Sequence, residues 1–104
     1  MTMKNEIIDP LEMKDAKVQE QIELLSVGDI LSIYRPGRHA RGEQNDYNEV
    51  SRSIILTVDD AGFYLAIIYC ATPGYDDEVL IQGNNYSFSK HLLFRYPWKV
   101  QNAV

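Results

Sequence analysis

The sequence predicts a mainly β domain with an amphipathic α-helix near its N-terminal end. From Asp29 onward, short apolar and β-branched runs alternate with turn-forming residues, whereas the apolar residues before Gly28 recur at helical spacing. The 104 residues, of which 45% are hydrophobic, are enough for one hydrophobic core and too few for two. We therefore expect a helical extension at residues 1–27 and a small β domain at residues 28–104, together in a single compact unit.

The segment Asp9-Pro10-Leu11-Glu12 has the residue types of a helix start. Asp suits the N-cap, Pro suits the first helical position, and Glu12 completes a capping box. Gly28 is placed to end the helix, and four apolar residues fall on one of its sides: Leu11, Val18, Ile22 and Leu25. We expect an amphipathic helix over residues 9–25 that packs on the β domain.

Five segments have the composition of β-strands: 30–34, 53–58, 63–70, 79–82 and 92–100. Turn residues at 59–62 and 83–85 are typical of hairpin connections. The segment 63–70 is apolar on both faces, which predicts a central strand covered on both sides. Pro97 cannot donate a ladder hydrogen bond, so we expect the last strand to lie at an edge of the sheet.

The net charge of −5 argues against a protein that attracts nucleic acid through its overall field. The acidic excess is uneven, because residues 1–30 hold seven acidic and three basic side chains. Two basic groups remain, at Arg35, Arg38, Arg41 and Arg52 and at Lys90, Arg95 and Lys99. The first group borders an irregular segment at residues 35–52, and compact domains seldom keep such a long loop unless it serves binding or is disordered. Ordinary solvated side chains are the alternative interpretation of both groups.

No apolar run approaches the length of a membrane span, and the N-terminus lacks the apolar region of a signal peptide. We therefore expect a cytoplasmic protein with no membrane partner. Cys70 is the single cysteine and has only His39 and His91 beside it, which excludes a disulfide scaffold and a zinc module. We expect no metal and no cofactor.

Three further patterns are candidates for chemistry, each with a simpler interpretation. Cys70 with His91 or His39 has the residue types of a thiol nucleophile and its base, but a lone cysteine ending an apolar strand is usually a small buried hydrophobe. The acids Asp76 and Asp77 lie in a turn, where solvation explains them better than acid–base catalysis.

The third pattern is a stripe of alternating aromatic residues at Phe94, Tyr96 and Trp98. With Arg95 and Lys99 beside it, the stripe has the features of a surface that stacks unpaired bases and holds phosphates. The alternative is the core-facing side of an edge strand.

The β segments also contain short motifs in a familiar order. Gly28-Asp29-Ile30 opens the first strand, Gly42-Glu43-Gln44 lies in the long loop, and Arg52 precedes the apolar segment 54–58. Tyr69-Cys70-Ala71-Thr72 ends the next strand, and Gly74-Tyr75 and Glu78-Val79-Leu80 follow. Over about residues 28–82 the chain resembles the PemK/MazF family of toxin endoribonucleases. Ser53 stands where that family has proline, and the part after Gly83 matches poorly.

The resemblance implies an SH3-like small β-barrel, a homodimer and metal-independent cleavage of single-stranded RNA. The catalytic residues of the family fall on Arg52 and Thr72. Its substrate-binding loop falls on Arg35, Arg38, His39, Arg41, Glu43 and Gln44.

The resemblance implies that Arg52 and Thr72 act by electrostatic stabilisation of the reacting phosphodiester. An arginine fork and a hydroxyl hold a phosphodiester and stabilise its charge while the ribose 2′-OH attacks. Arginine is almost wholly protonated at neutral pH, so proton transfer requires a lowered arginine pKa, a water molecule, or His39 or Glu43.

Toxins of this family are neutralised by an acidic antitoxin segment laid over the RNA groove, so an acidic antitoxin or another protein is an expected partner. The acidic helix at residues 9–25 is expected either to cover the basic surface in the same way or merely to cap the barrel. The second hypothesis for the whole chain is a non-catalytic small-barrel protein-interaction module, such as a phage or plasmid regulatory protein, that docks a partner through the long loop and the aromatic edge.

Overall fold

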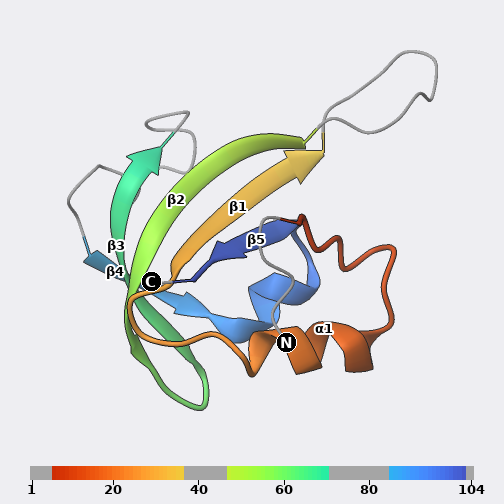
Figure 1. The fold of residues 1–104 in the computed structure, drawn as a ribbon, viewed down its shortest axis with the longest axis horizontal. Helices are drawn as coiled ribbons and strands as arrows, with labels where there is room; N and C mark the ends of the chain where they lie inside the picture. Colours follow the sequence, from red (N-terminus) through yellow and green to blue (C-terminus); the bar gives the residue numbers. More distant parts are fainter. Residues whose placement is uncertain (1–5, 37–46, 71–84, 103–104) are drawn as a thin grey trace.

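A computed structural model describes residues 6–36, 47–70 and 85–102 of the chain (Figure 1). Its elements in chain order are α1 (Asp15–Ile22), β1 (Ile30–Pro36), β2 (Tyr47–Val58), β3 (Gly62–Cys70), β4 (Asn85–Ser89), the 3₁₀ helix η1 (Lys90–Phe94) and β5 (Trp98–Gln101). The fold is mainly β with one α-helix, as predicted. Neither helix of the described residues is long and apolar enough to cross a membrane.

The strands form one antiparallel sheet in the order β4-β3-β2-β1-β5. The first four strands are neighbours in chain order, and β5 returns after η1 to pair with β1 on the opposite side from β2. Within the described residues β4 and β5 do not pair with each other, so the sheet has two open edges. The predicted edge position of the last strand is confirmed.

One face of the sheet carries the hydrophobic core, which α1 and η1 cover (Figure 1). The buried residues on this side are Ile8, Val18, Ile22, Leu25, Leu31, Ile33, Ile55, Phe63, Leu65, Leu93, Trp98 and Val100. Trp98 is fully buried, and its indole Nε1 donates to the carbonyl of Leu93 at 3.0 Å. The backbone of Ile8 bonds reciprocally to that of Trp98 at 2.7 and 3.0 Å. The segment before β1 therefore contributes to the core directly.

The helix is shorter than predicted and starts later, at Asp15 instead of Asp9. Asp9 stabilises a separate turn, because its carboxylate accepts from the backbone N–H of Leu11 at 3.0 Å and its carbonyl accepts from Glu12 at 2.9 Å. This turn leaves Leu11 75% exposed, whereas the other three apolar residues of the predicted stripe are buried. Gly28 does not end the helix. Its positive φ of 94° shapes the turn into β1.

The hairpin between β2 and β3 confirms the predicted turn at residues 59–62. Asp59 Oδ1 accepts from the N–H groups of Ala61 and Gly62, each at 2.9 Å. The prediction that the next strand is covered on both faces is wrong. Tyr64 and Tyr69 of β3 are about two-fifths exposed at 41% and 40%, and the central strand of the sheet is β2.

The predicted strand at residues 92–100 is also wrong in its first half. Residues Lys90–Phe94 form η1, which is followed by a hydrogen bond from Arg95 N–H to the Leu92 carbonyl at 3.0 Å, and only Trp98–Gln101 is extended. The predicted strand at 79–82 lies outside the described residues, and β4 is a strand that was not predicted. The irregular segment is shorter than expected, since β1 continues to Pro36 and β2 begins at Tyr47.

Candidate anion-binding site on the open face of the sheet

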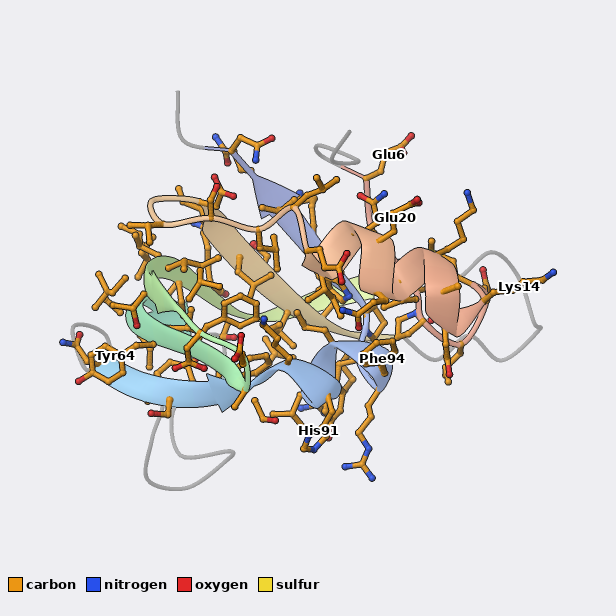
Figure 2. All side chains as sticks on the ribbon, turned by 90° about the horizontal axis from the view of Figure 1, so that it is seen from below. Glu6, Lys14, Glu20, Tyr64, His91 and Phe94 are labelled. Atoms are coloured by element: carbon orange, nitrogen blue, oxygen red, sulfur yellow. The ribbon has the colours of Figure 1, made fainter. Side chains whose placement is uncertain are left out.

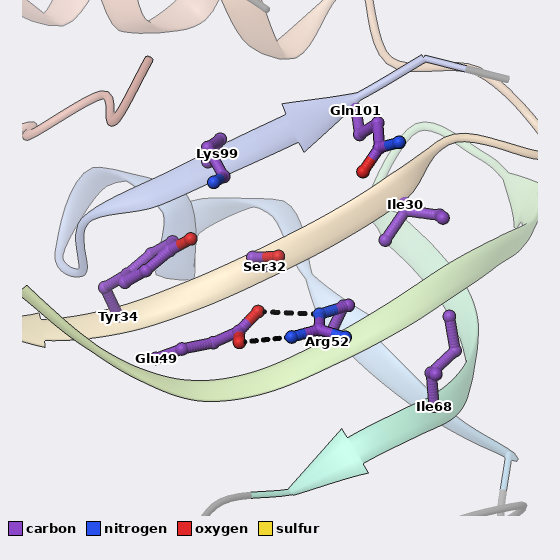
Figure 3. A pocket seen from close by; sticks show the side chains of 8 residues that line it. All are labelled: Ile30, Ser32, Tyr34, Glu49, Arg52, Ile68, Lys99 and Gln101. Carbon is purple, nitrogen blue, oxygen red and sulfur yellow. Dashed lines mark hydrogen bonds and ion pairs between the residues drawn. The ribbon is translucent and has the colours of Figure 1, made fainter. Parts of the chain in front are cut away.

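The face of the sheet opposite the core is covered by neither described helix, and we call it the open face. It carries a row of polar residues. Ser32 of β1 pairs in register with Arg52 of β2 on one side and with Lys99 of β5 on the other. Arg52 in turn pairs with Tyr69 of β3. Because paired residues of neighbouring strands point to the same face, Lys99, Ser32 and Arg52 form a line across three strands (Figure 3).

A pocket of about 310 Å³ opens along this row (Figure 3). Its lining residues come from four strands: Ile30, Ser32, Tyr34, Glu49, Arg52, Ile68, Lys99 and Gln101. The volume lies at the lower end of the range for small-ligand sites. The pocket combines two cations, one carboxylate, two hydroxyls and one amide with the apolar side chains of Ile30 and Ile68.

An ion pair in the pocket joins Arg52 and Glu49. The guanidinium donates from Nε to Oε2 at 2.9 Å and from Nη2 to Oε1 at 2.6 Å, which is a bidentate arrangement (Figure 3). The Arg52 side chain is 42% exposed and the Glu49 side chain 19%. The guanidinium therefore retains a solvent-facing side while the carboxylate lies deeper.

A β-bulge makes this ion pair possible. Residues three apart on a regular strand point to opposite faces, so Glu49 and Arg52 would be separated by the sheet. The register pairs Ile33 with Ser51 but Tyr34 with Glu49, which leaves Val50 as the extra residue of β2. The extra residue brings the Glu49 side chain to the same face as Arg52.

A second bulge brings Tyr69 to the site. Arg52 pairs with Tyr69 and Ser53 with Ile67, so Ile68 is the extra residue of β3. Ile67 and Tyr69 would share a face on a regular strand, yet Ile67 is 3% exposed and Tyr69 is 40% exposed. The Arg52 guanidinium carbon lies 5.1 Å from the centre of the Tyr69 ring, within the range of a cation–π contact.

The charges of the site reinforce one another. The pKa of Glu49 lies below its ordinary value, mainly because Arg52 donates hydrogen bonds to it, with a further hydrogen bond from the Ser32 hydroxyl and the positive charges of Arg52 and Lys99. Partial burial opposes this effect. The hydrogen bond to Glu49 raises the pKa of Arg52 in return. A guanidinium with a raised pKa serves as a fixed cation and cannot serve as a base.

The residues predicted for catalysis and substrate binding are only partly described. Arg52 lies within β2, five residues after its first residue Tyr47, and not before the strand as expected. Arg35 lies in β1 and does not line the pocket. The remaining predicted site residues lie outside the described residues: Thr72, Arg38, His39, Arg41, Glu43 and Gln44. Asp76 and Asp77 also lie outside them.

The predicted aromatic stripe is not a stacking surface as a whole. Trp98 is fully buried with its Nε1 bonded to Leu93, and Phe94 packs against the core. Tyr96 alone of the three is substantially exposed, at 45%. The core-facing interpretation is therefore correct for Trp98. Lys99, which was assigned to the same stripe, points the other way into the pocket.

The acidic helix does not cover the pocket. Val18 and Ile22 of α1 are buried in the core on the opposite face of the sheet, and no residue of α1 lines the pocket within the described part of the chain. The side chains of Glu20 in α1 and of Lys14, the residue before α1, point outward (Figure 2). The helix therefore packs as a cap on the core and does not cover Arg52 and Lys99 in the pocket. Arg38 and Arg41 of the predicted basic surface lie outside the described residues, so the expectation that the helix covers that surface stays a prediction.

Sequence reasoning missed the combination of Glu49, Ser32 and Lys99 with Arg52. Lys99 was identified as basic but assigned to another surface, and Glu49 was counted only as a charge.

Within the described residues no three His, Cys, Asp or Glu side chains lie close enough together to bind a metal ion.

Comparisons of the chain with family models, with curated proteins and with solved structures return no match. The resemblance to the PemK/MazF family therefore stays a prediction.

Proposed function

We propose that this protein binds single-stranded RNA on the open face of its sheet, as an RNA-binding or RNA-cleaving relative of the PemK/MazF-like toxins. The observation that carries the proposal is the row of Lys99, Ser32 and Arg52, which ends at the exposed ring of Tyr69. Single-strand binders combine cations that follow the phosphate backbone with aromatic rings that stack bases. The row offers both on one face.

The overall negative charge does not oppose this assignment. Screening limits the effect of exposed charges to about 10 Å at moderate salt. The acidic residues of α1 lie on the opposite side of the sheet from the pocket. The residues that line the pocket carry two positive charges, on Arg52 and Lys99, and one negative charge, on Glu49.

The proposal includes the fold and assembly that the resemblance implies. The strand order β4-β3-β2-β1-β5, with a 3₁₀ helix between the last two strands in the chain, supports the SH3-like barrel of this proposal. A homodimer and an acidic antitoxin partner belong to the same proposal. If the protein cleaves RNA, Arg52 acts as the cation that holds the phosphodiester, with Thr72 as the second catalytic group, and another group takes the proton of the 2′-OH, because the pKa of Arg52 is raised.

The test is binding of a fluorescent mixed-sequence oligoribonucleotide, measured by anisotropy over a range of salt concentrations. We expect Lys99→Ala to weaken binding several-fold and to reduce the slope of log affinity against log salt by about 0.7, the value for one phosphate contact on a single strand. Lys17→Ala is the matched control. It removes the same charge from an exposed position on α1, where the Lys17 ammonium lies 3.9 Å from the Glu20 carboxylate.

Incubation of the same RNA in EDTA, with Arg52→Ala in parallel, separates binding from cleavage. Metal-independent cleavage that disappears in Arg52→Ala supports a nuclease. Binding without cleavage supports an RNA-binding relative. Absence of any binding at low salt, or equal losses in Lys99→Ala and Lys17→Ala, would reject the proposed function and favour the non-catalytic protein-interaction module.

A further inference from the structure

The donors on the open face of the sheet converge on a single carboxylate. Glu49 accepts two hydrogen bonds from the Arg52 guanidinium, and the Ser32 hydroxyl and the Lys99 ammonium of the same pocket both favour its ionised form. A guanidinium fork, a hydroxyl and a nearby ammonium are the groups that hold a phosphate in protein sites. The Glu49 carboxylate therefore occupies the place of an anionic ligand.

We propose that Glu49 is an internal competitor for this site, so that a ligand phosphate must displace its carboxylate from Arg52 in order to bind. The inference rests on the proposed function for the identity of the ligand. The competition itself follows from the contacts, because the two Glu49 oxygens already accept from Arg52 Nε and Nη2. These are the same two donors that a phosphate uses in a bidentate contact.

Competition of this kind favours extended ligands. A single phosphate at Arg52 only exchanges one anion for another and gains little. An oligonucleotide also reaches Lys99 and the exposed Tyr69 ring, because both lie in the same row as Arg52. These additional contacts offset the loss of the Glu49 contact, so Glu49 sets a threshold that selects chains of phosphates over isolated ones.

The alternative role for Glu49 is to position Arg52 for the ligand, and it predicts the opposite change of affinity. If Glu49 were a positioning residue, its contact would hold the guanidinium in the orientation that the ligand needs. Removal of the contact would then weaken binding, because the freed Arg52 side chain would have to be ordered by the ligand. The two roles therefore predict changes of affinity in opposite directions.

Two variants separate direct displacement from a general effect of charge. Glu49→Gln removes the charge and nearly preserves the shape of the side chain. Glu49→Asp keeps the charge but is one methylene shorter, so it cannot make the same bidentate contact. We expect Glu49→Gln to bind the oligoribonucleotide roughly 2- to 5-fold more tightly, a range set by the usual strength of partly exposed ion pairs, and Glu49→Asp to show part of this gain. A loss of affinity in either variant, or a gain confined to Glu49→Gln, would overturn the proposal.

A second probe does not depend on RNA. The Nε–H group of Arg52 gives its own signal in a ¹H–¹⁵N spectrum, and titration with inorganic phosphate should shift this signal at several-fold lower concentrations in Glu49→Gln than in the wild type. Equal titration in both proteins, or no shift in either, would overturn the competition. A shift with phosphate in the variant, together with no RNA binding by any protein, would reject the proposed function and leave the competition intact.

Discussion

The two faces of the sheet differ in chemistry although they are built from alternating residues of the same strands. In β5, Trp98 and Val100 are fully buried on the core face, whereas Lys99 lines the pocket on the open face. In β1, Leu31 is buried among apolar residues and its neighbour Ser32 contributes a hydroxyl to the polar row. Successive side chains of a strand point to opposite faces, so a single step along a strand separates residues that stabilise the core from residues that form the pocket.

The largest expected effect tests this comparison on two adjacent residues of β5. Trp98→Ala removes a fully buried aromatic side chain and its hydrogen bond to Leu93, and should lower the free energy of unfolding by about 3–5 kcal/mol. Lys99→Ala, one residue later, should change it by less than about 0.5 kcal/mol. Urea unfolding followed by circular dichroism measures both values.

Similar losses of stability in Trp98→Ala and Lys99→Ala would contradict this difference between the two faces. Comparable losses would mean that the open face is also packed against another part of the chain, and Lys99 would then be unsuitable as a probe of binding. Retained stability in Lys99→Ala, in contrast, validates its use in the RNA experiment.

A smaller loss of stability is expected when the hydrogen bond between the N-terminal segment and the start of β2 is removed. The Tyr47 hydroxyl donates to Asp9 Oδ2 at 2.9 Å, and Asp9 is 9% exposed. Tyr47→Phe removes the donor and leaves that carboxylate oxygen without it, so we expect a loss of about 1–2 kcal/mol in the free energy of unfolding. Tyr96→Phe is the control, because Tyr96 is 45% exposed. Equal stability of Tyr47→Phe and the control would show that this hydrogen bond contributes nothing.

Much of the core face could be predicted because its signals are local. Alternation placed Trp98 and Val100 on one side of the last strand, helical spacing placed Val18 and Ile22 on one side of α1, and the acid-rich turn at residues 59–62 has the chemistry of a hairpin. The errors have physical causes as well. The Asp9 carboxylate bonds to the second residue after it, which forms a turn and delays the helix.

The open face could not be predicted in the same way, because its geometry depends on register. The Glu49–Arg52 pair exists only because Val50 is an extra residue in β2, and Tyr69 reaches Arg52 only because Ile68 is an extra residue in β3. Neither residue has a distinctive type that would mark a bulge in the sequence. Lys99 and Arg52 are brought together by the pairing of β1 with both of their strands, which is a non-local property.

The smallest effect concerns the pH dependence of stability on the open face. The pKa of Glu49 is lower in the folded protein than its ordinary value, chiefly because of Arg52, so its contact stabilises the fold above the unfolded-state pKa and is lost as the pH falls through the folded-state pKa. Because Arg52 is 42% exposed, solvent screening limits the contribution to about 0.5–1 kcal/mol. Glu49→Gln should therefore be less stable than the wild type by this amount near pH 7, and the difference should shrink as the pH falls below the ordinary pKa of a glutamate side chain. Glu20→Gln removes the same charge from an exposed position on α1 and separates the local contact from the effect of overall charge. A stability difference for Glu49→Gln that stays constant over this pH range would mean that Arg52 does not hold the ionised carboxylate, and the basis for competition at this site would disappear with it.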